Sequence, residues 1–182
     1  MKKILGLVLT IVLVLSLGAC GKKEVKTNET PKVEKKEKVE ERLAKFPEFK
    51  LNDLNGNEVS NEDFKNYDIT MINIWGTFCP PCIEELPELE KLSEAYKDKN
   101  FRLMGIIVDR DEYGAKELLK EKGATYTNFV PNRNIEGLLA NFDAVPTTIF
   151  VNKNGEVLRK IVVGSRSFED YDEIVKELLE NQ

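Results

Sequence analysis

The junction between an apolar strand pattern and two closely spaced cysteines restricts the fold more than any other feature of the chain. Ile69 to Trp75 (ITMINIW) is a short apolar run bounded by polar residues, which predicts a buried strand. Cys79-Pro80-Pro81-Cys82 follows three residues later and opens a long predicted helix over 80–97. A strand that is apolar on both faces needs helices packed against its sheet, so an α/β architecture is expected.

The remaining strand and helix patterns alternate in the same way. Asn55-Gly56 and Asn154-Gly155 are turn dipeptides that predict hairpins, and Gly123 closes a helix at the position where glycine is common. Strands are predicted over 48–51, 58–59, 101–108, 125–130, 147–152 and 156–163, and further helices over 61–66, 112–122, 134–141 and 168–180. This order predicts one central mixed β-sheet flanked by helices on both faces.

Length and charge limit the classes of function that the chain can have. The 182 residues predict one domain with a tail. Residues 46–182 hold 16 basic and 26 acidic residues, a net charge of −10, whereas residues 21–45 carry +3. An acidic folded part is a poor nucleic-acid binder, so no nucleic-acid partner is expected. The chain has no histidine, which excludes histidine triads, histidine general bases and histidine metal ligands.

The first 19 residues have the pattern of a signal peptide. Two lysines precede an apolar run over 4–17, which is too short for the roughly 20 residues of a spanning helix. The ending Leu17-Gly18-Ala19-Cys20 resembles the lipobox of bacterial lipoproteins. The resemblance implies cleavage before Cys20, lipidation of Cys20, and an extracytoplasmic protein anchored to the bacterial cell membrane. An ordinary secretory signal, or a membrane stub with an incidental cysteine, remains an alternative.

Residues 20–45 are predicted to be the lipidated cysteine followed by a disordered, charged tether. Apolar residues are too few there to offset the entropy of ordering the chain. Twenty-five flexible residues reach about 25–30 Å. The segment holds the folded domain, residues 46–182, away from the membrane, with a plain solvated spacer as the other interpretation.

The two cysteines at the helix start carry the predicted chemistry. A thiolate is the species that attacks a disulfide, and unpaired N–H groups and the helix dipole at a helix N-terminus stabilise it. Cys79 is therefore predicted to attack and Cys82, one turn later, to resolve the mixed disulfide. A structural Cys79–Cys82 disulfide and a zinc half-site are the alternatives, but zinc would need two more ligands, and no metal or cofactor is expected.

The surroundings of the cysteines resemble a known family. WGTFCPPC after a buried strand, followed by EELP, is similar to the TlpA/ResA-like branch of the thioredoxin superfamily, over residues 46–182. The resemblance implies a thioredoxin fold with an N-terminal β-hairpin and a central insertion near residues 123–134. Phe78 departs from the family, which often has tryptophan there.

Val145-Pro146-Thr147 is a second mark of that family. The resemblance implies a cis Pro146 beside the cysteines, with the Val145 backbone free to pair with a substrate peptide. An ordinary trans proline at a strand start is the alternative. The residues predicted to bind substrate are Trp75, Phe78, Pro80, Pro81, Val145, Pro146 and Thr147, although Trp75 is expected to pack beneath the site.

Glu85 is predicted from helix geometry as a third catalytic residue. At 100° per residue, Glu85 lies on the apolar face one turn after Cys82, whereas Glu84 lies on the opposite face. Burial and a nearby thiolate raise a carboxyl pKa, so Glu85 could exchange a proton with Cys82. The family resemblance places an active-site glutamate at this position. A glutamate at the rim, bent into solvent, is the alternative.

These features together predict an extracytoplasmic, membrane-anchored thiol–disulfide oxidoreductase. The resemblance implies a reductase whose clients are apocytochrome c or a methionine sulfoxide reductase-type protein. It also implies an integral-membrane electron donor of the CcdA/DsbD-like kind, and a monomer is expected. The alternatives are a disulfide-forming oxidase, a redox-sensing lipoprotein without enzymatic activity, and a thiol peroxidase.

The predicted anchor can be tested with one substitution. Cys20→Ala should release the protein from membranes and leave the activity of the folded domain unchanged, because 25 residues separate the two. Membrane fractionation and an activity assay check this outcome. Continued membrane association of the variant would indicate an uncleaved leader.

Overall fold

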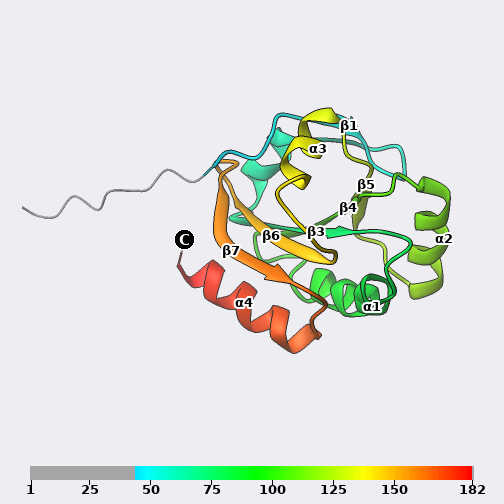
Figure 1. The fold of residues 1–182 in the computed structure, drawn as a ribbon. Coiled ribbons are helices and arrows are strands. Elements are labelled where there is room, and N and C mark those ends of the chain that lie inside the picture. Colours follow the sequence, from blue (N-terminus) through cyan, green and yellow to red (C-terminus); the bar gives the residue numbers. More distant parts are fainter. Residues whose placement is uncertain (1–43, 182) are drawn as a thin grey trace, which may run out of the picture. The chain divides into compact units, whose positions relative to one another are not determined.

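The computed structural model describes residues 44–181, so the predicted signal peptide, Cys20 and nearly all of the tether lie outside the described residues. A five-stranded sheet has the strand order β5-β4-β3-β6-β7, and a separate two-stranded hairpin precedes it (Figure 1). The elements are β1 (Lys50–Asn52), β2 (Glu58–Ser60), the 3₁₀ helix η1 (Asn61–Asn66), β3 (Ile69–Trp75), α1 (Pro80–Ala95), β4 (Phe101–Ile107), α2 (Glu112–Lys122), β5 (Thr127–Phe129), α3 (Arg133–Leu139), β6 (Thr147–Asn152), β7 (Val157–Val163) and α4 (Phe168–Glu180).

The predicted mixed sheet is confirmed. Strand β3 is central and pairs in parallel with β4 and antiparallel with β6. Strand β5 extends the sheet in parallel beyond β4, and β7 extends it antiparallel beyond β6. All seven residues of β3 are buried, as its mainly apolar pattern predicts.

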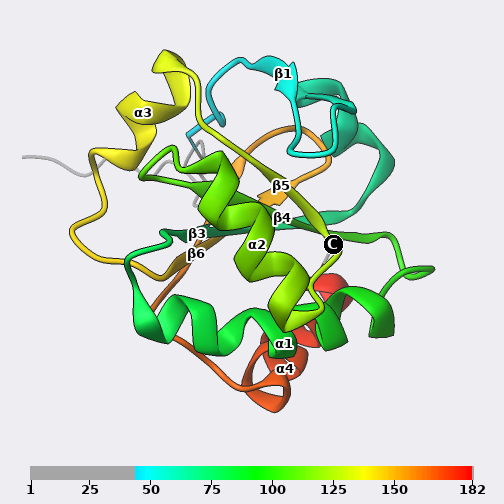
Figure 2. The same ribbon diagram turned by 90° about the vertical axis from the view of Figure 1, so that its right-hand side faces the viewer.

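Two apolar layers hold the helices on the sheet. Helices α1, α2 and α4 cover one face, and the β1–β2 hairpin, η1 and α3 cover the other (Figure 2). On the hairpin side, four aromatic rings pack at centroid distances of 5.4–5.9 Å. Those rings belong to Phe46, Phe49, Phe64 and Phe129. The N-terminal hairpin therefore closes the face that the three larger helices leave uncovered.

The element boundaries differ from the predictions in a few places. Strand β1 begins at Lys50 rather than at residue 48, because the Asn61 side chain forms hydrogen bonds with backbone groups of the residues that precede Lys50. Asn61 Oδ1 accepts from Phe49 N at 2.6 Å, and Asn61 Nδ2 donates to Pro47 O at 3.1 Å. Helix α1 ends at Ala95, two residues early, where the chain turns toward β4. The predicted bounds of β3, α2, β6 and α4 are confirmed.

A row of polar residues crosses the sheet beneath α1. In register, Asn128 on β5 lies beside Gly105 on β4, Gly105 beside Asn73 on β3, and Asn73 beside Thr148 on β6. All three polar side chains are buried. Gly105 leaves the space that Asn128 fills, since a Cβ there would lie 1.8 Å from Asn128 Oδ1. The sheet thus carries a polar strip through an otherwise apolar interior.

No helix within residues 44–181 is long and apolar enough to cross a membrane.

Gly105→Ala should destabilise the fold by about 1–3 kcal/mol, the usual cost of overpacking a core. The new methyl group meets Asn128 Oδ1 and, at 3.0 Å, Trp75 Nε1. Urea unfolding of the oxidised protein measures the free energy. Gly137→Ala, in α3 with nothing within 4 Å of the added Cβ, is the control and should be neutral or stabilising by up to about 1 kcal/mol. Equal stabilities for the two variants would contradict the packing of the polar row.

Candidate active site

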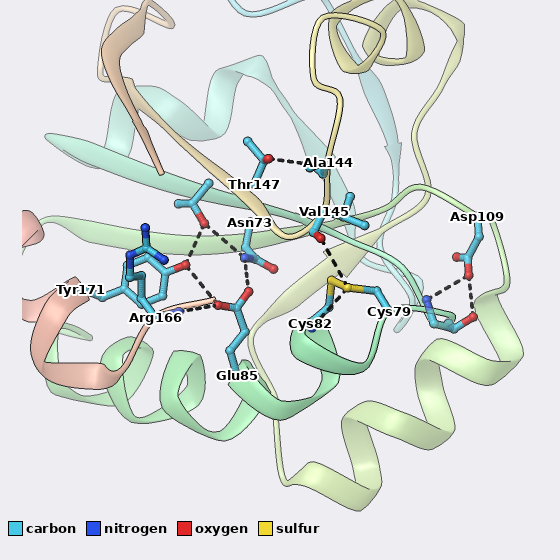
Figure 3. The surroundings of a disulfide bond; sticks show 12 residues. Asn73, Cys79, Cys82, Glu85, Asp109, Ala144, Val145, Thr147, Arg166 and Tyr171 are labelled. Carbon is cyan, nitrogen blue, oxygen red and sulfur yellow. Dashed lines mark hydrogen bonds between the residues drawn. A yellow bond between two sulfur atoms is a disulfide. The ribbon is translucent and has the colours of Figure 1, made fainter. Parts of the chain in front are cut away.

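Cys79 and Cys82 form a disulfide at the start of α1 (Figure 3). Cys79 is the N-cap residue, and its Sγ accepts a hydrogen bond from Cys82 N at 3.3 Å. The two positions between them are prolines, which have no N–H, so Cys82 supplies the first amide hydrogen of the helix. Cys79 is 6% exposed and Cys82 is 0% exposed. Solvent and partner molecules therefore reach the pair from the Cys79 side.

A cis proline lies against this disulfide. The Val145–Pro146 peptide bond is cis, which confirms the prediction for Pro146. The carbonyl oxygen of Val145 lies 3.6 Å from Cys79 Sγ. Thr147 Oγ1 donates to Ala144 O at 2.7 Å and fixes the loop before β6. The backbone of Val145 thus runs directly beside the sulfur that is predicted to attack.

Glu85 is buried beneath α1, so it does not bend into solvent. Its carboxylate accepts three hydrogen bonds: from Asn73 Nδ2 to Oε1 at 2.9 Å, and from Arg166 N and Tyr171 Oη to Oε2, each at 3.2 Å. Burial raises the pKa of Glu85 from 4.5 to about 7, and these hydrogen bonds oppose the rise. Glu85 therefore changes its protonation state near neutral pH.

Two hydroxyl groups complete the surroundings of Glu85. Tyr171 projects from α4, and its Oη lies 3.1 Å from Thr148 Oγ1 (Figure 3). Thr148 Oγ1 also accepts from Asn73 Nδ2 at 3.2 Å. Burial, first of all, and the adjacent Glu85 carboxylate raise the pKa of Tyr171. The result is a connected buried network from the central strand to the last helix.

Asp109 has a role that the sequence did not reveal. Asp109 lies in a charged loop over 109–111, and its side chain is partly buried. Its Oδ2 accepts hydrogen bonds from both the backbone N and the hydroxyl of Thr77, in the loop that leads to Cys79. Asp109 therefore holds the chain between β3 and α1 in place.

The predicted substrate-binding residues divide into accessible and buried groups. Phe78 is 65% exposed, and both prolines of the cysteine motif are exposed. Trp75 is fully buried, with its Nε1 donating to Asn128 Oδ1 at 2.9 Å, so its side chain cannot touch a substrate. The Thr147 side chain is also buried, and it too supports the site from below. Pro146 is buried and Val145 is half-buried, so Val145 is the accessible residue of the Val145-Pro146-Thr147 segment.

An apolar recess lies next to the exposed residues. It opens between the loop that precedes Cys79 and the segment that joins α3 to β6. Its lining residues are Ile74, Phe78, Val108, Leu139, Phe142, Asp143, Ala144 and Val145. The recess thus shares Phe78 and Val145 with the surroundings of the disulfide. Within residues 44–181, no group of three or more Cys, Asp or Glu side chains is placed to hold a metal ion.

Residues 42–175 match the family model described as Redoxin. The chain belongs to the Redoxin family. The curated relatives of this redoxin include the "Thiol-disulfide oxidoreductase ResA" of Geobacillus kaustophilus, 29% identical over 69% of this chain and 71% of the relative. The protein of the same name from Bacillus thuringiensis is 28% identical over 72% and 75%.

Solved structures agree with these sequence relatives. A thiol:disulfide interchange protein of the thioredoxin family from Chlorobium tepidum has a TM-score of 0.67 and 26% identity, over 76% of this chain and 97% of that one. A DsbF homologue from Corynebacterium diphtheriae has a TM-score of 0.64 and 27% identity, over 76% and 88%. The predicted thioredoxin fold and resemblance to the TlpA/ResA-like branch are confirmed. The redoxin is a thiol–disulfide oxidoreductase of the ResA/DsbE type.

The sequence did not single out Thr148, Tyr171 and the Arg166 amide as neighbours of Glu85. One signal was available: Asn73 and Thr148 are polar residues in the middle of apolar strands, where a polar side chain needs a buried partner. Nothing local in the sequence indicates that the last helix supplies Tyr171, because that contact spans 86 residues.

The raised pKa of Glu85 predicts how stability depends on pH. The folded protein binds this proton more tightly than the unfolded chain, so the free energy of unfolding should fall as pH rises from about 4.5 to about 7 and then level off. The contribution is about 3 kcal/mol, since one pKa unit corresponds to about 1.4 kcal/mol. Urea unfolding of the oxidised protein at pH 5 and pH 8 measures it.

Glu85→Gln should remove most of this pH dependence, while Glu84→Gln, on the exposed face of α1, should retain it. The same slope in wild type and Glu85→Gln would show that Glu85 does not titrate in this range.

Proposed function

We propose that this redoxin reduces disulfide bonds in client proteins and is oxidised to the Cys79–Cys82 disulfide in the process. The arrangement of the disulfide supports this direction. A disulfide is a strong oxidant when its reduced, dithiol form is stabilised, as in proteins whose attacking thiolate has a very low pKa. Here the two prolines remove two of the N–H groups that would otherwise stabilise a Cys79 thiolate. This single feature is the strongest support for a reducing pair.

Glu85 favours the same direction. A carboxylate near Cys82 disfavours a second negative charge on that sulfur, and burial of Cys82 adds to the effect. Both disfavour a thiolate at Cys82. Ionisation therefore adds little to the stability of the dithiol form, and the dithiol passes its two electrons more readily to another disulfide.

The reaction has two exchange steps. The Cys79 thiolate attacks one sulfur of the client disulfide, forms a mixed disulfide and releases the other client sulfur as a thiolate, which takes a proton from water. Cys82 then gives its proton to the Glu85 carboxylate and attacks Cys79 Sγ. The Cys79–Cys82 disulfide forms, and the second client sulfur leaves as a thiolate that takes a proton from water. Glu85 then returns its proton to solvent, and two electrons have moved to the client.

Client recognition uses the accessible part of the site. An extended client segment lies along the backbone of Val145, whose carbonyl oxygen is 3.6 Å from Cys79 Sγ. Phe78, Pro80 and Pro81 provide exposed apolar contacts, and the apolar recess accepts a side chain that flanks the client cysteine. Apocytochrome c and a methionine sulfoxide reductase-type protein are the proposed clients.

The cellular setting is proposed from the N-terminal sequence. The leader and the lipobox-like Leu17-Gly18-Ala19-Cys20 support export and a lipid anchor at Cys20, and the charged tether holds the domain outside the membrane. Each cycle leaves the redoxin oxidised, so an integral-membrane electron donor of the CcdA/DsbD-like kind must reduce it again.

Trapping tests the proposed order of attack. Cys82→Ser should accumulate mixed disulfides through Cys79, because Cys79 caps the helix and is the more exposed sulfur, and because the resolving thiol is gone. Non-reducing electrophoresis and mass spectrometry of the variant, mixed with an oxidised client, detect the adduct. Cys79→Ser is the matched control and should form none. Adducts through Cys82 instead would reverse the roles, and rapid peroxide consumption would favour a peroxidase.

Glu85→Gln should slow reduction of a client disulfide by about 10- to 100-fold, near the lower end of what a general acid–base group contributes. The pKa values of the cysteine thiols should fall, since a nearby negative charge has been removed. Stopped-flow disulfide exchange and pH-dependent alkylation measure the two effects. Glu84→Gln should behave like wild type, and identical rates and titrations for both variants would remove Glu85 from the mechanism.

A further inference from the structure

The buried carboxamide of Asn73 has an oxygen without a hydrogen-bond partner. Its Nδ2 donates to Glu85 Oε1 at 2.9 Å and to Thr148 Oγ1 at 3.2 Å, which uses both amide hydrogens. Among the residues that the structure describes, Oδ1 accepts no hydrogen bond, although the side chain is 0% exposed. Buried acceptors are nearly always paired, so this oxygen requires an explanation.

The orientation of the carboxamide indicates the missing donor. Figure 3 shows the nitrogen of Asn73 directed at Glu85, with the oxygen on the side of the disulfide. Cys82 is fully buried, so water does not solvate its sulfur. When the disulfide is reduced, Cys82 gains an S–H group, which is a hydrogen-bond donor.

We infer that Asn73 is a positioning residue that connects the resolving thiol to Glu85. In the dithiol form, Cys82 Sγ–H donates to Asn73 Oδ1, while Asn73 Nδ2 continues to donate to the Glu85 carboxylate. The inference rests on the proposed function, because it concerns the reduced form that carries electrons to the client.

The same carboxamide can stabilise the opposite protonation state if it flips, so that Oδ1 and Nδ2 exchange positions. If Cys82 is a thiolate and Glu85 is protonated, Nδ2 can donate to the Cys82 sulfur, and Oδ1 can accept from the Glu85 O–H. The state in which both groups are anionic is unfavourable, because Oδ1 then faces one of the two anions in either orientation. A thiolate beside Oδ1 is repelled, and a carboxylate beside Oδ1 loses its donor. The carboxamide therefore favours the two states in which Cys82 and Glu85 share a single proton.

The neighbouring hydroxyl groups tolerate both orientations. Because Tyr171 donates its single hydroxyl hydrogen to Glu85 Oε2, Thr148 Oγ1 is the donor to Tyr171 Oη in the observed orientation. Thr148 can accept from Nδ2 in one orientation and donate to Oδ1 in the other, and Tyr171 continues to donate to Glu85 Oε2. No group in the network loses all of its partners when the carboxamide turns.

Other ionisable groups near Glu85 keep their charge state near neutral pH. Tyr171 on α4 and Tyr126 before β5 both have a raised pKa, caused mainly by burial, and so stay neutral. Arg166 donates its backbone N–H to Glu85, and its guanidinium group acts on the carboxylate through space. Cys79 faces Cys82 from the helix N-terminus.

A titration of the reduced wild-type protein tests this arrangement without a substitution. Carbon-13 NMR of Cys82 Cβ and Glu85 Cδ, with nitrogen-15 NMR of the Asn73 side-chain amide, is recorded from pH 5 to pH 10. Both carbons should show two shared titration steps, and the Asn73 amide resonance should move at the same pH values. Independent single steps for Cys82 and Glu85, or an Asn73 amide that does not respond, would overturn the inference.

Asn73→Leu removes the connection while keeping a side chain of similar size. The second exchange step should slow by about 10-fold, with the rate of the first attack by Cys79 unchanged, so mixed disulfides should last longer in rapid-quench experiments. Thr148→Val is the matched control: it removes the other acceptor of Nδ2, and the shared titration steps should persist. If the wild-type protein showed no first attack on a client disulfide, the proposed function itself would fail. Equal rates of the second step in wild type and Asn73→Leu would reject only the role of Asn73.

Discussion

The buried carboxyl group of Glu85 is the constraint on which the rest of the site depends. An acid in an apolar layer must be protonated or surrounded by donors, and here three donors from three parts of the chain meet it. Asn73 comes from the central strand, the Arg166 amide from the segment before α4, and Tyr171 from α4 itself. When the last helix packs on α1, it therefore also completes a proton-binding site beneath the disulfide.

The central sheet makes this possible because one row across it is polar. Gly105 leaves room for the Asn128 carboxamide, which fixes Trp75 below the cysteine loop. On the other side of the row, Asn73 donates to both Glu85 and Thr148. Above the row, the paired prolines limit the N–H groups that face Cys79. The two sulfurs thus have different surroundings, one near the surface and one above a buried acid.

The sequence predicted the parts of the molecule that local patterns determine. The mainly apolar pattern of Ile69 to Trp75 placed β3, and the left-handed Gly123 closed α2 as expected, with φ of +70°. Helical periodicity was enough to put Glu85 on the buried face. The partners of Glu85 could not be predicted, because strand register and the docking of α4 bring them together over long separations in the chain. Asp109 was missed for the same reason: it contacts Thr77 across 32 residues, and a charged loop gives no local sign of that contact.

The reduction potential of the Cys79–Cys82 pair tests the central claim most directly. The protein would be equilibrated at pH 7 with thioredoxin and glutathione redox buffers, and the oxidised fraction read by alkylation and mass spectrometry. Weak stabilisation of the thiolates predicts a potential near the reducing end of such proteins, close to the value of about −270 mV for thioredoxin. A potential near about −120 mV, the value of a strong disulfide-forming oxidant, would contradict the proposal that this redoxin reduces its clients.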